Sequence, residues 1–279
     1  MKNRRSFLKK SAIFGSGLFI VPRNVLGGPG FIAPSDQLNI ASIGSGGKGY
    51  DITHDWASRE RVIALCDVHP DKSDVINARK KYPNANVYVD FREMLDIEKD
   101  LDAVTVSTPD HTHGIIASNA MNRGLHVYVQ KPLTHNIEEA RKLTQIAKKN
   151  KVVTQMGNQG GSSTGVVKIQ EWVDKKMIGK IKKIYAWTNR PVWPQGFPMQ
   201  DNNEEKPKNL NWDLWLGPAS YTKYTSQLHP FNWRGWWDYG TGALGDMGCH
   251  ILDAPYKTLG LHYPTDVECS VGSVYQQAW

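Results

Sequence analysis

The sequence is poor in cysteine. Only three cysteines occur in 279 residues, and their wide separation provides neither a disulfide framework nor a paired zinc motif. They are Cys66, Cys249 and Cys269. We therefore expect each of them to be a small buried apolar residue rather than a bridge or a metal ligand.

Acidic residues are absent from the whole segment before Asp36. Six basic residues occur in that segment, and without them the formal net charge of +7 falls to +1. The remaining chain is nearly neutral and has no basic stripe, so nucleic acid is excluded as a partner class.

Long apolar runs are also missing. The run from Ser11 to Val21 is too short to cross a bilayer and ends at Pro22. It follows Arg4 and Arg5 and resembles a twin-arginine export signal. We expect residues 1–35 to be this signal and a linker, and the protein to be periplasmic or otherwise exported, with no membrane span once mature. Because no clear Ala-x-Ala cleavage site follows, an uncleaved membrane anchor stays open.

Short apolar runs alternate with amphipathic stretches from Gln37 to about Gly157. This alternation predicts an α/β fold with a doubly wound parallel sheet, the Rossmann architecture, over residues 36–157. The predicted strands are 38–43, 62–66, 103–106, 126–129 and 152–156. The predicted helices are 48–58, 71–81, 113–123 and 136–149.

The composition changes after a Gly- and Ser-rich stretch at 157–165, and tryptophan and proline dominate the loops that follow. We predict strands at 181–188 and 267–275 and a helix at 250–259, and assign 158–279 to an α+β domain. The last residues resemble a strand that has no turn or cap. We therefore expect a C-terminally truncated chain whose second, mostly antiparallel sheet is incomplete.

A glycine loop follows the first predicted strand directly. Its glycines serve three different purposes, which are a tight turn, close approach of the backbone to a diphosphate, and packing of the next helix on the strand. The pattern therefore predicts a dinucleotide-binding loop. Its glycines are Gly44, Gly46, Gly47 and Gly49.

Asp67 ends the second predicted strand, eighteen positions after Gly49. This is close to the spacing of a carboxylate that hydrogen-bonds the ribose hydroxyls of a dinucleotide. Because an anion there repels a 2′-phosphate, we expect NAD rather than NADP. The alternative, a helix cap, suits Asp71 better.

The next strand runs into the segment from Ser107 to His113 at the carboxyl edge of the sheet. Asp110, His111 and His113 suggest a metal, but three ligands within four residues of one turn seldom face one ion, so we assign no metal site. We expect a loop that borders the cofactor, with Thr108, Pro109 and His113 as contacts.

Lys131 follows the next strand at the same edge, before Pro132. Its ammonium can reach a substrate hydroxyl or the carboxamide of a nicotinamide, although a plain surface lysine is the alternative. Farther along, a Gly-rich run contains Asp246 and His250. If a helix begins near Gly248, His250 and Asp253 share one face of it; the alternative is a turn with an aspartate cap and a structural histidine.

Taken together, the glycine loop, Asp67, the Thr108-Pro109 turn, Gln130-Lys131-Pro132 and the segment from Gly242 to His250 resemble the Gfo/Idh/MocA oxidoreductases. With the leader, the chain is similar to the exported bacterial branch of that family. The resemblance implies a Rossmann domain, an open-faced α/β domain that can mediate a homo-oligomer, a nicotinamide cofactor, and sugar or polyol substrates. The Trp-rich loops could stack on sugars, form the core or mediate oligomer contacts.

By the resemblance, Lys131 matches the active-site lysine of the family, which also contacts the cofactor, and Asp246 and His250 match its acid and base pair. The chain departs from the usual Glu-Lys-Pro at Gln130, where an amide replaces a carboxylate. We expect His250 to take the proton of a sugar hydroxyl and Lys131 to stabilise charge on the oxygen. We expect Asp246 to bind a neighbouring hydroxyl and to hold His250 in its basic tautomer; the sequence does not separate these roles.

The predicted activity is an NAD-dependent dehydrogenase that oxidises a secondary CH–OH of a sugar, glycoside or polyol. One alternative is a glycoside-cleaving enzyme that oxidises, eliminates and reduces its substrate again without net use of NAD. A second is a non-catalytic nucleotide- or sugar-binding protein. Because free NAD is scarce outside the cytoplasm, we expect an exported protein to hold its NAD tightly.

Overall fold

A computed structural model describes residues 32–56, 59–199, 203–270 and 272 of the chain. Contacts divide the chain into two units, Met1–Leu38 and Asn39–Trp279, and the first contains a short 3-10 helix, η1 (Pro34–Asp36). Residues 1–31 of the predicted export signal lie outside the described residues. No helix in the described ranges has the length and apolar character needed to cross a membrane.

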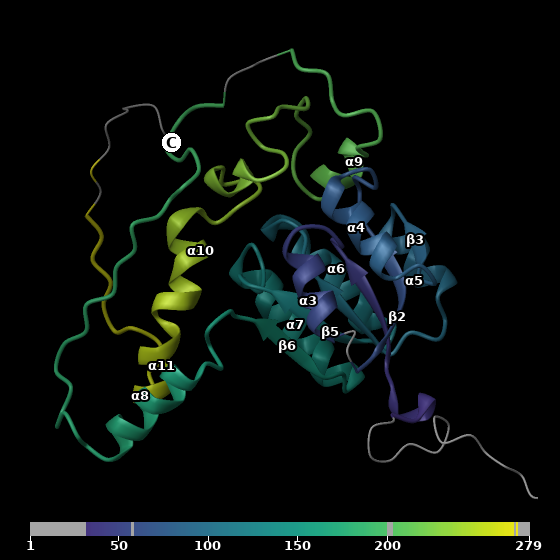
Figure 1. Cartoon of the computed structure of the whole chain (residues 1–279). Helices are drawn as coiled ribbons and strands as arrows, with labels where there is room; N and C mark the ends of the chain where they lie inside the picture. The colour runs from purple at the N-terminus through teal and green to yellow at the C-terminus, as the bar shows by residue number, and fades with distance from the viewer. Residues whose placement is uncertain (1–31, 57–58, 200–202, 271, 273–279) are drawn as a thin grey trace, which may run out of the picture. The chain divides into compact units, whose positions relative to one another are not determined.

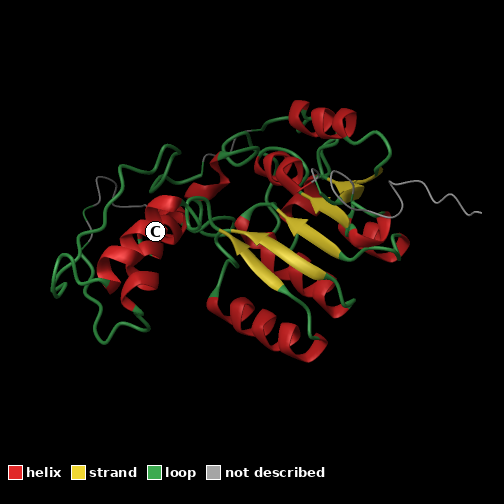
Figure 2. Ribbon diagram, turned by 60° about the horizontal axis from the view of Figure 1, so that its bottom comes forward, coloured by secondary structure: helices red, strands yellow, loops and turns green. Residues whose placement is uncertain are grey.

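A six-stranded parallel sheet forms the centre of the second unit (Figure 2). Its strand order is β3-β2-β1-β4-β5-β6, so the order reverses between β1 and β4, as in a Rossmann sheet. The strands are β1 (Asn39–Ile43), β2 (Arg61–Cys66), β3 (Asn86–Tyr88), β4 (Ala103–Val106), β5 (His126–Gln130) and β6 (Thr154–Gly157). The predicted α/β fold is confirmed.

Helices lie on both faces of this sheet (Figure 2). The connecting helices are α3 (Lys48–Trp56), α4 (Ser73–Lys81), α5 (Phe91–Ile97), α6 (Asp110–Asn122) and α7 (Ile137–Asn150). Helix α3 contacts α4, whereas α6 contacts both α5 and α7, which gives two rows of helices. Local sequence supports their starts: Asn136 and Glu139 form a capping box at α7, and Asp90 caps α5.

The second half of the chain is built from helices and long loops. Its elements are α8 (Thr164–Asp174), α9 (Trp212–Leu216), the 3-10 helix η2 (Asn232–Gly235), α10 (Gly242–Ile251) and α11 (Asp253–Leu259). Helix α11 contacts both α8 and α10 (Figure 1). The helix predicted at 250–259 thus corresponds to the end of α10 and the whole of α11.

Two strands predicted for the second half are not found among the described residues. Residues 181–188 have no regular structure and lie mostly exposed, and the same holds for 267–270; the rest of the second predicted strand falls largely on residues that are not described. An apolar, β-branched pattern becomes a strand only where a neighbouring backbone pairs with it. The described part of these segments has no such partner, so the expected antiparallel sheet is absent from it.

Two clusters of buried apolar side chains stabilise the unit. The larger one joins the parallel strands to α5, α6 and α7, and Cys66 lies in it as expected. Cys249 is only half-buried and Cys269 is exposed, so the expectation of burial was wrong for Cys269. Cys269 lies within the segment predicted as a strand at 267–275, and no sheet covers it in the part of the chain that the structure describes.

Tryptophans form the second cluster. Trp212, Trp215 and Trp233 are buried there, and Trp212 stacks on Trp215 with ring centroids 4.5 Å apart. For these residues the core interpretation of the Trp-rich loops is correct. Trp187 and Trp237 remain exposed.

His111 connects helix α6, beside the parallel sheet, to the Trp cluster. It lies in the first turn of α6, and its ring nitrogens face the carbonyl oxygens of Trp215 (3.0 Å) and Tyr239 (3.2 Å). Burial lowers the pKa of His111 to about 4. Its ring is therefore neutral near pH 7 and donates one N–H to one of the two carbonyls.

This burial makes stability depend on pH. The pKa of His111 is below its ordinary value of 6.5 in the folded chain, so the unfolded chain binds the extra proton as the pH falls from about 6.5 to about 4. The free energy of unfolding should decrease over that window. We expect the urea midpoint to drop between about pH 7.5 and pH 5, and to drop less in H111Q than in the wild type. An exposed-histidine control, H262Q, should keep the wild-type dependence; an H111Q profile that follows the wild type would refute this origin.

Candidate active site

A cavity of about 550 Å3 opens at the carboxyl ends of β1, β2 and β4, where the strand order reverses. The glycine loop and the segment after β4 line one side. Residues around α9 and η2, from the Trp-rich half, line the other. Of the predicted cofactor contacts, those that line the cavity are Gly44, Gly46, Gly47, Asp67, Thr108 and Pro109.

The glycines of the loop allow close packing that side chains would prevent. A Cβ on Gly44, whose φ is 76°, would lie 2.8 Å from the carbonyl carbon of Ser107. A Cβ on Gly49 would lie 1.8 Å from the carbonyl oxygen of Gly44. Gly49 does not line the cavity; it lets α3 pack against the end of β1 and so aims the start of the helix at the cavity.

Two backbone amides of the loop donate to carboxylates. Gly46 N–H donates to Asp67 Oδ2 at 3.1 Å, and Gly47 N–H donates to Asp74 Oδ2 at 2.6 Å. Lys72 Nζ also donates to Asp74 Oδ2, at 2.8 Å. These amides at the start of α3 are the groups that bind a diphosphate in this type of loop, so a bound diphosphate has to compete with the carboxylates.

Asp67 lies where a ribose-binding carboxylate is expected. Its second oxygen accepts from His69 N–H at 3.0 Å. Burial raises the pKa of Asp67, while the two backbone hydrogen bonds oppose this shift. The nearby Ser107 hydroxyl lines the cavity and is buried without a hydrogen-bond partner in the described chain. The residues therefore fit a dinucleotide: a glycine cradle, a carboxylate and an unused polar group share one cavity.

His113 has a different place from the one predicted. It is buried in α6 and does not line the cavity. Its ring nitrogens face the carbonyl oxygens of Thr108 (2.8 Å) and Pro132 (2.7 Å). His113 thus links the cofactor loop to the Lys131-Pro132 turn and positions both of them.

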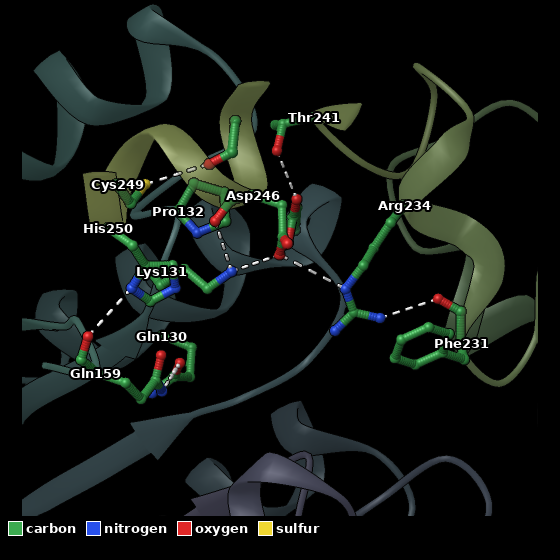
Figure 3. Close-up of polar contacts among 12 residues, drawn as sticks. Gln130, Lys131, Pro132, Gln159, Phe231, Arg234, Thr241, Asp246, Cys249 and His250 are labelled. Atoms are coloured by element: carbon green, nitrogen blue, oxygen red, sulfur yellow. Dashed lines mark hydrogen bonds and ion pairs between the residues drawn. The ribbon is translucent and has the colours of Figure 1, made fainter. Parts of the chain in front are cut away.

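Lys131 and Asp246 come together although 115 positions separate them (Figure 3). Lys131 Nζ donates to Asp246 Oδ1 at 2.5 Å and to the carbonyl oxygen of Asp246 at 3.0 Å. The side chains are only 13% and 12% exposed, so this is a largely desolvated ion pair. Lys131 is not a surface lysine.

Asp246 and His250 lie on one face of the same helix. Helix α10 begins at Gly242, not near Gly248 as predicted, so the two residues are four positions apart within it. Asp253 instead begins α11 and pairs with Lys257. Glycine lowers the intrinsic helix propensity of this segment. At Gly245, however, a larger residue does not fit, because an added Cβ would lie 2.2 Å from the Thr241 side chain.

His250 is oriented by a backbone carbonyl. Its Nδ1 lies 3.1 Å from the carbonyl oxygen of Gln159, in the turn after β6 (Figure 3). A carbonyl can only accept, so Nδ1 carries the hydrogen and Nε2 of the neutral ring is free to accept a proton. The contact that favours this tautomer in the structure is made by Gln159, whereas the sequence predicted this role for Asp246. Gln130, the departure from the family pattern, accepts from the Gln159 side chain at 2.9 Å.

The structure places three further residues beside the Lys131–Asp246 pair that were not predicted as site residues: Asp110, Thr241 and Arg234. Asp110 accepts from Thr241 Oγ1 at 3.0 Å and so holds the start of α10 against α6. Arg234 Nε lies 3.8 Å from Asp246 Oδ1. A signal existed for Arg234: it is the one cation in the Trp-rich run from Asn232 to Trp237. In the described residues no group of histidine, cysteine and acidic side chains could hold a metal.

Comparison with known families agrees with this geometry. A model described as an oxidoreductase family with an NAD-binding Rossmann fold matches residues 38–158, and the C-terminal α/β domain model of the same family matches residues 162–278. The chain belongs to the Gfo/Idh/MocA oxidoreductase family.

The sequence identity to individual curated proteins is low. A levoglucosan dehydrogenase of Pseudarthrobacter phenanthrenivorans is 22% identical over 80% of this chain and 52% of its own length. An alpha-N-acetylgalactosaminidase of Shewanella oneidensis is 28% identical over 53% of this chain and 37% of its own. The chain thus spans about half or less of these curated relatives. The structure of myo-inositol 2-dehydrogenase from Lactobacillus plantarum aligns with a TM-score of 0.48 and 25% identity, over 52% of this chain and 43% of that one.

Proposed function

We propose that this member of the Gfo/Idh/MocA family is an NAD-dependent oxidoreductase that oxidises a secondary hydroxyl of a sugar, glycoside or polyol. The observation that carries the proposal is the largely buried Lys131–Asp246 pair, whose Asp246 lies on the same face of α10 as His250. The predicted dinucleotide loop lies at the same edge of the sheet. The name of the levoglucosan dehydrogenase relative supports the substrate class.

In the proposed reaction His250, Lys131 and Asp246 have separate roles. A bound nicotinamide ring supplies the acceptor for the hydride that leaves the substrate carbon. His250 Nε2 accepts the hydroxyl proton, because Gln159 holds the hydrogen of the ring on Nδ1. Lys131 stabilises the negative charge that develops on the oxygen, and Asp246 holds its ammonium in place.

Asp67 supports NAD rather than NADP as the cofactor. A 2′-phosphate at Asp67 would meet its carboxylate and that of the neighbouring Asp74, which already binds the ammonium of Lys72. We expect D67N to weaken NAD binding about tenfold and to reduce the preference over NADP. Titrating both nucleotides against the wild type, D67N and the exposed control D96N checks this; an unchanged preference in D67N would contradict it.

A second function is favoured by the relatives named as glycosyl hydrolase family 109 proteins. In that case the same residues would oxidise a glycoside and assist elimination of the aglycone beside the new ketone. Water would then add to the resulting double bond, and the ketone would be reduced again by the same NADH. Free NADH separates the two functions. Incubation of the protein with excess NAD and a panel of glycosides yields accumulating NADH for a dehydrogenase, and released aglycone without NADH for the redox-neutral enzyme.

We also propose that the protein is exported and keeps its NAD through many turnovers. The shape of the cavity supports tight binding of NAD, because residues around α9 and η2 enclose it on the side opposite the glycine loop. Dialysis of the purified protein should then leave nucleotide bound.

A further inference from the structure

Arg234 stands between the cofactor cavity and the proposed catalytic pair. It lines the cavity, and its Nε lies 3.8 Å from Asp246 Oδ1 (Figure 3). Its side chain is 25% exposed, so much of the guanidinium is removed from water. The positive charge of Arg234 can therefore interact directly with a ligand group that lies beside Lys131 and Asp246.

The guanidinium has unused hydrogen-bonding capacity. Arginine carries five N–H donors, and among the described residues only the carbonyl of Phe231 accepts from it, from Nη1 at 2.9 Å. The distance to Asp246 is an ion-pair distance rather than a hydrogen bond, and Asp246 Oδ1 already accepts from Lys131. A partly buried cation with free donors favours an anionic acceptor.

The local charges leave room for an anion. Two cations, Lys131 and Arg234, lie among two carboxylates, Asp110 and Asp246, so the cluster has no excess of negative charge. Binding of the oxidised, positively charged nicotinamide would add a positive charge to this balanced cluster, which favours an anionic substrate.

The backbone and the rings around Arg234 hold it in place. Its guanidinium lies over the rings of Trp233 (4.2 Å) and Phe231 (4.6 Å). A Cβ on Gly240 would lie 2.5 Å from the Cα of Arg234, so that turn packs directly on its backbone. Such a preorganised fork matches the two oxygens of a carboxylate.

We propose that Arg234 binds a carboxylate of the substrate, so that the substrate is a sugar acid. The inference rests on the proposed oxidoreductase function and adds its substrate class. The diphosphate of the cofactor is the other possible source of oxyanions. The substrate is favoured because Arg234 lies beside Asp246, whereas the amides at the start of α3 are placed for phosphate.

The test compares matched pairs of acid and neutral sugar on the full chain loaded with NAD. The probes are D-glucuronate with D-glucose and D-galacturonate with D-galactose, and the readouts are ligand affinity and reduction of bound nicotinamide. We expect the wild type to favour the acid of at least one pair. R234Q should lose about 100-fold in kcat/KM for that acid, mainly through KM, and R234K about tenfold, while the neutral partner changes little.

Controls separate the possible failures. R190Q removes a cation over the same Trp193 ring, at the same 5.9 Å, and should leave the acid preference intact. Thermal unfolding midpoints of R234Q and R234K near the wild-type value show that they fold. Weaker NAD binding by a folded R234K would overturn the proposal in favour of the cofactor diphosphate. Reduction of nicotinamide by the neutral sugars alone, or no binding of either acid, overturns the sugar-acid inference but not the oxidoreductase function.

Discussion

Replacing Lys131 by methionine should lower kcat about 1000-fold while NAD remains bound. In the proposed reaction the ammonium stabilises the charge that develops on the substrate oxygen, and methionine of similar length cannot do so. The measurement is steady-state oxidation of a sugar identified by screening, together with the NAD content of the purified variant. Lys148, an exposed lysine of α7, provides the control K148M, which should behave as the wild type.

A structural effect of K131M can be separated from the catalytic one. Removing Lys131 leaves Asp246 with only the longer contact to Arg234, which should cost up to about 3 to 5 kcal/mol of stability. The double variant K131M/D246N removes both charges of the pair and keeps only the Arg234 charge, so it should recover part of that stability. It should not recover activity. Substantial activity in the double variant would show that the pair only supports the fold.

Replacing Gly49 by alanine should abolish tight NAD binding, with a loss of about 100-fold or more in affinity. The added Cβ would lie 1.8 Å from the carbonyl oxygen of Gly44, and neither atom belongs to a flexible side chain. Either α3 moves away from β1 or the glycine loop changes shape, and both changes displace the amides that face the cavity. Overpacking of this kind also costs about 1 to 3 kcal/mol or more of stability.

Gly165 offers a matched control for this variant. It also lies in a helix, α8, and the nearest atom to an added Cβ is the Ser163 hydroxyl oxygen at 3.7 Å. G165A should therefore leave both NAD affinity and stability near their wild-type values. Nucleotide titration and thermal unfolding of the two variants test the contrast. Equal NAD affinity in G49A and the wild type would argue against this loop as the diphosphate site.

The parallel sheet was predictable because its strands are short, apolar and buried on both faces. The runs ending at Ile43, Cys66 and Val106 have this character, and the structure places strands there. The strand Asn86–Tyr88 was missed because it has three residues, partly exposed, and gives no periodic signal. Helix α5 follows it and was missed with it.

The site was partly predictable from the residues that follow strands and form sequence motifs. Lys131 and Asp246 were both expected in the site, but their contact depends on where α10 begins, and its glycines conceal that start. Gln159 acts through its backbone carbonyl, which no side-chain pattern reveals. Asp110 was noticed only as a metal candidate, because its partner Thr241 lies 131 positions away.

The central claim is that bound nicotinamide accepts hydride from a carbohydrate carbon at this site. Rapid mixing of the NAD-loaded protein with a panel of sugars, sugar acids, glycosides and polyols, followed at the absorbance band of reduced nicotinamide, tests it most directly. We predict that at least one compound reduces the bound cofactor within a single turnover, even if the enzyme later returns the hydride, and that K131M loaded with NAD does so far more slowly. A chain that binds no nicotinamide nucleotide, or one whose bound NAD is reduced equally fast in K131M, would contradict it.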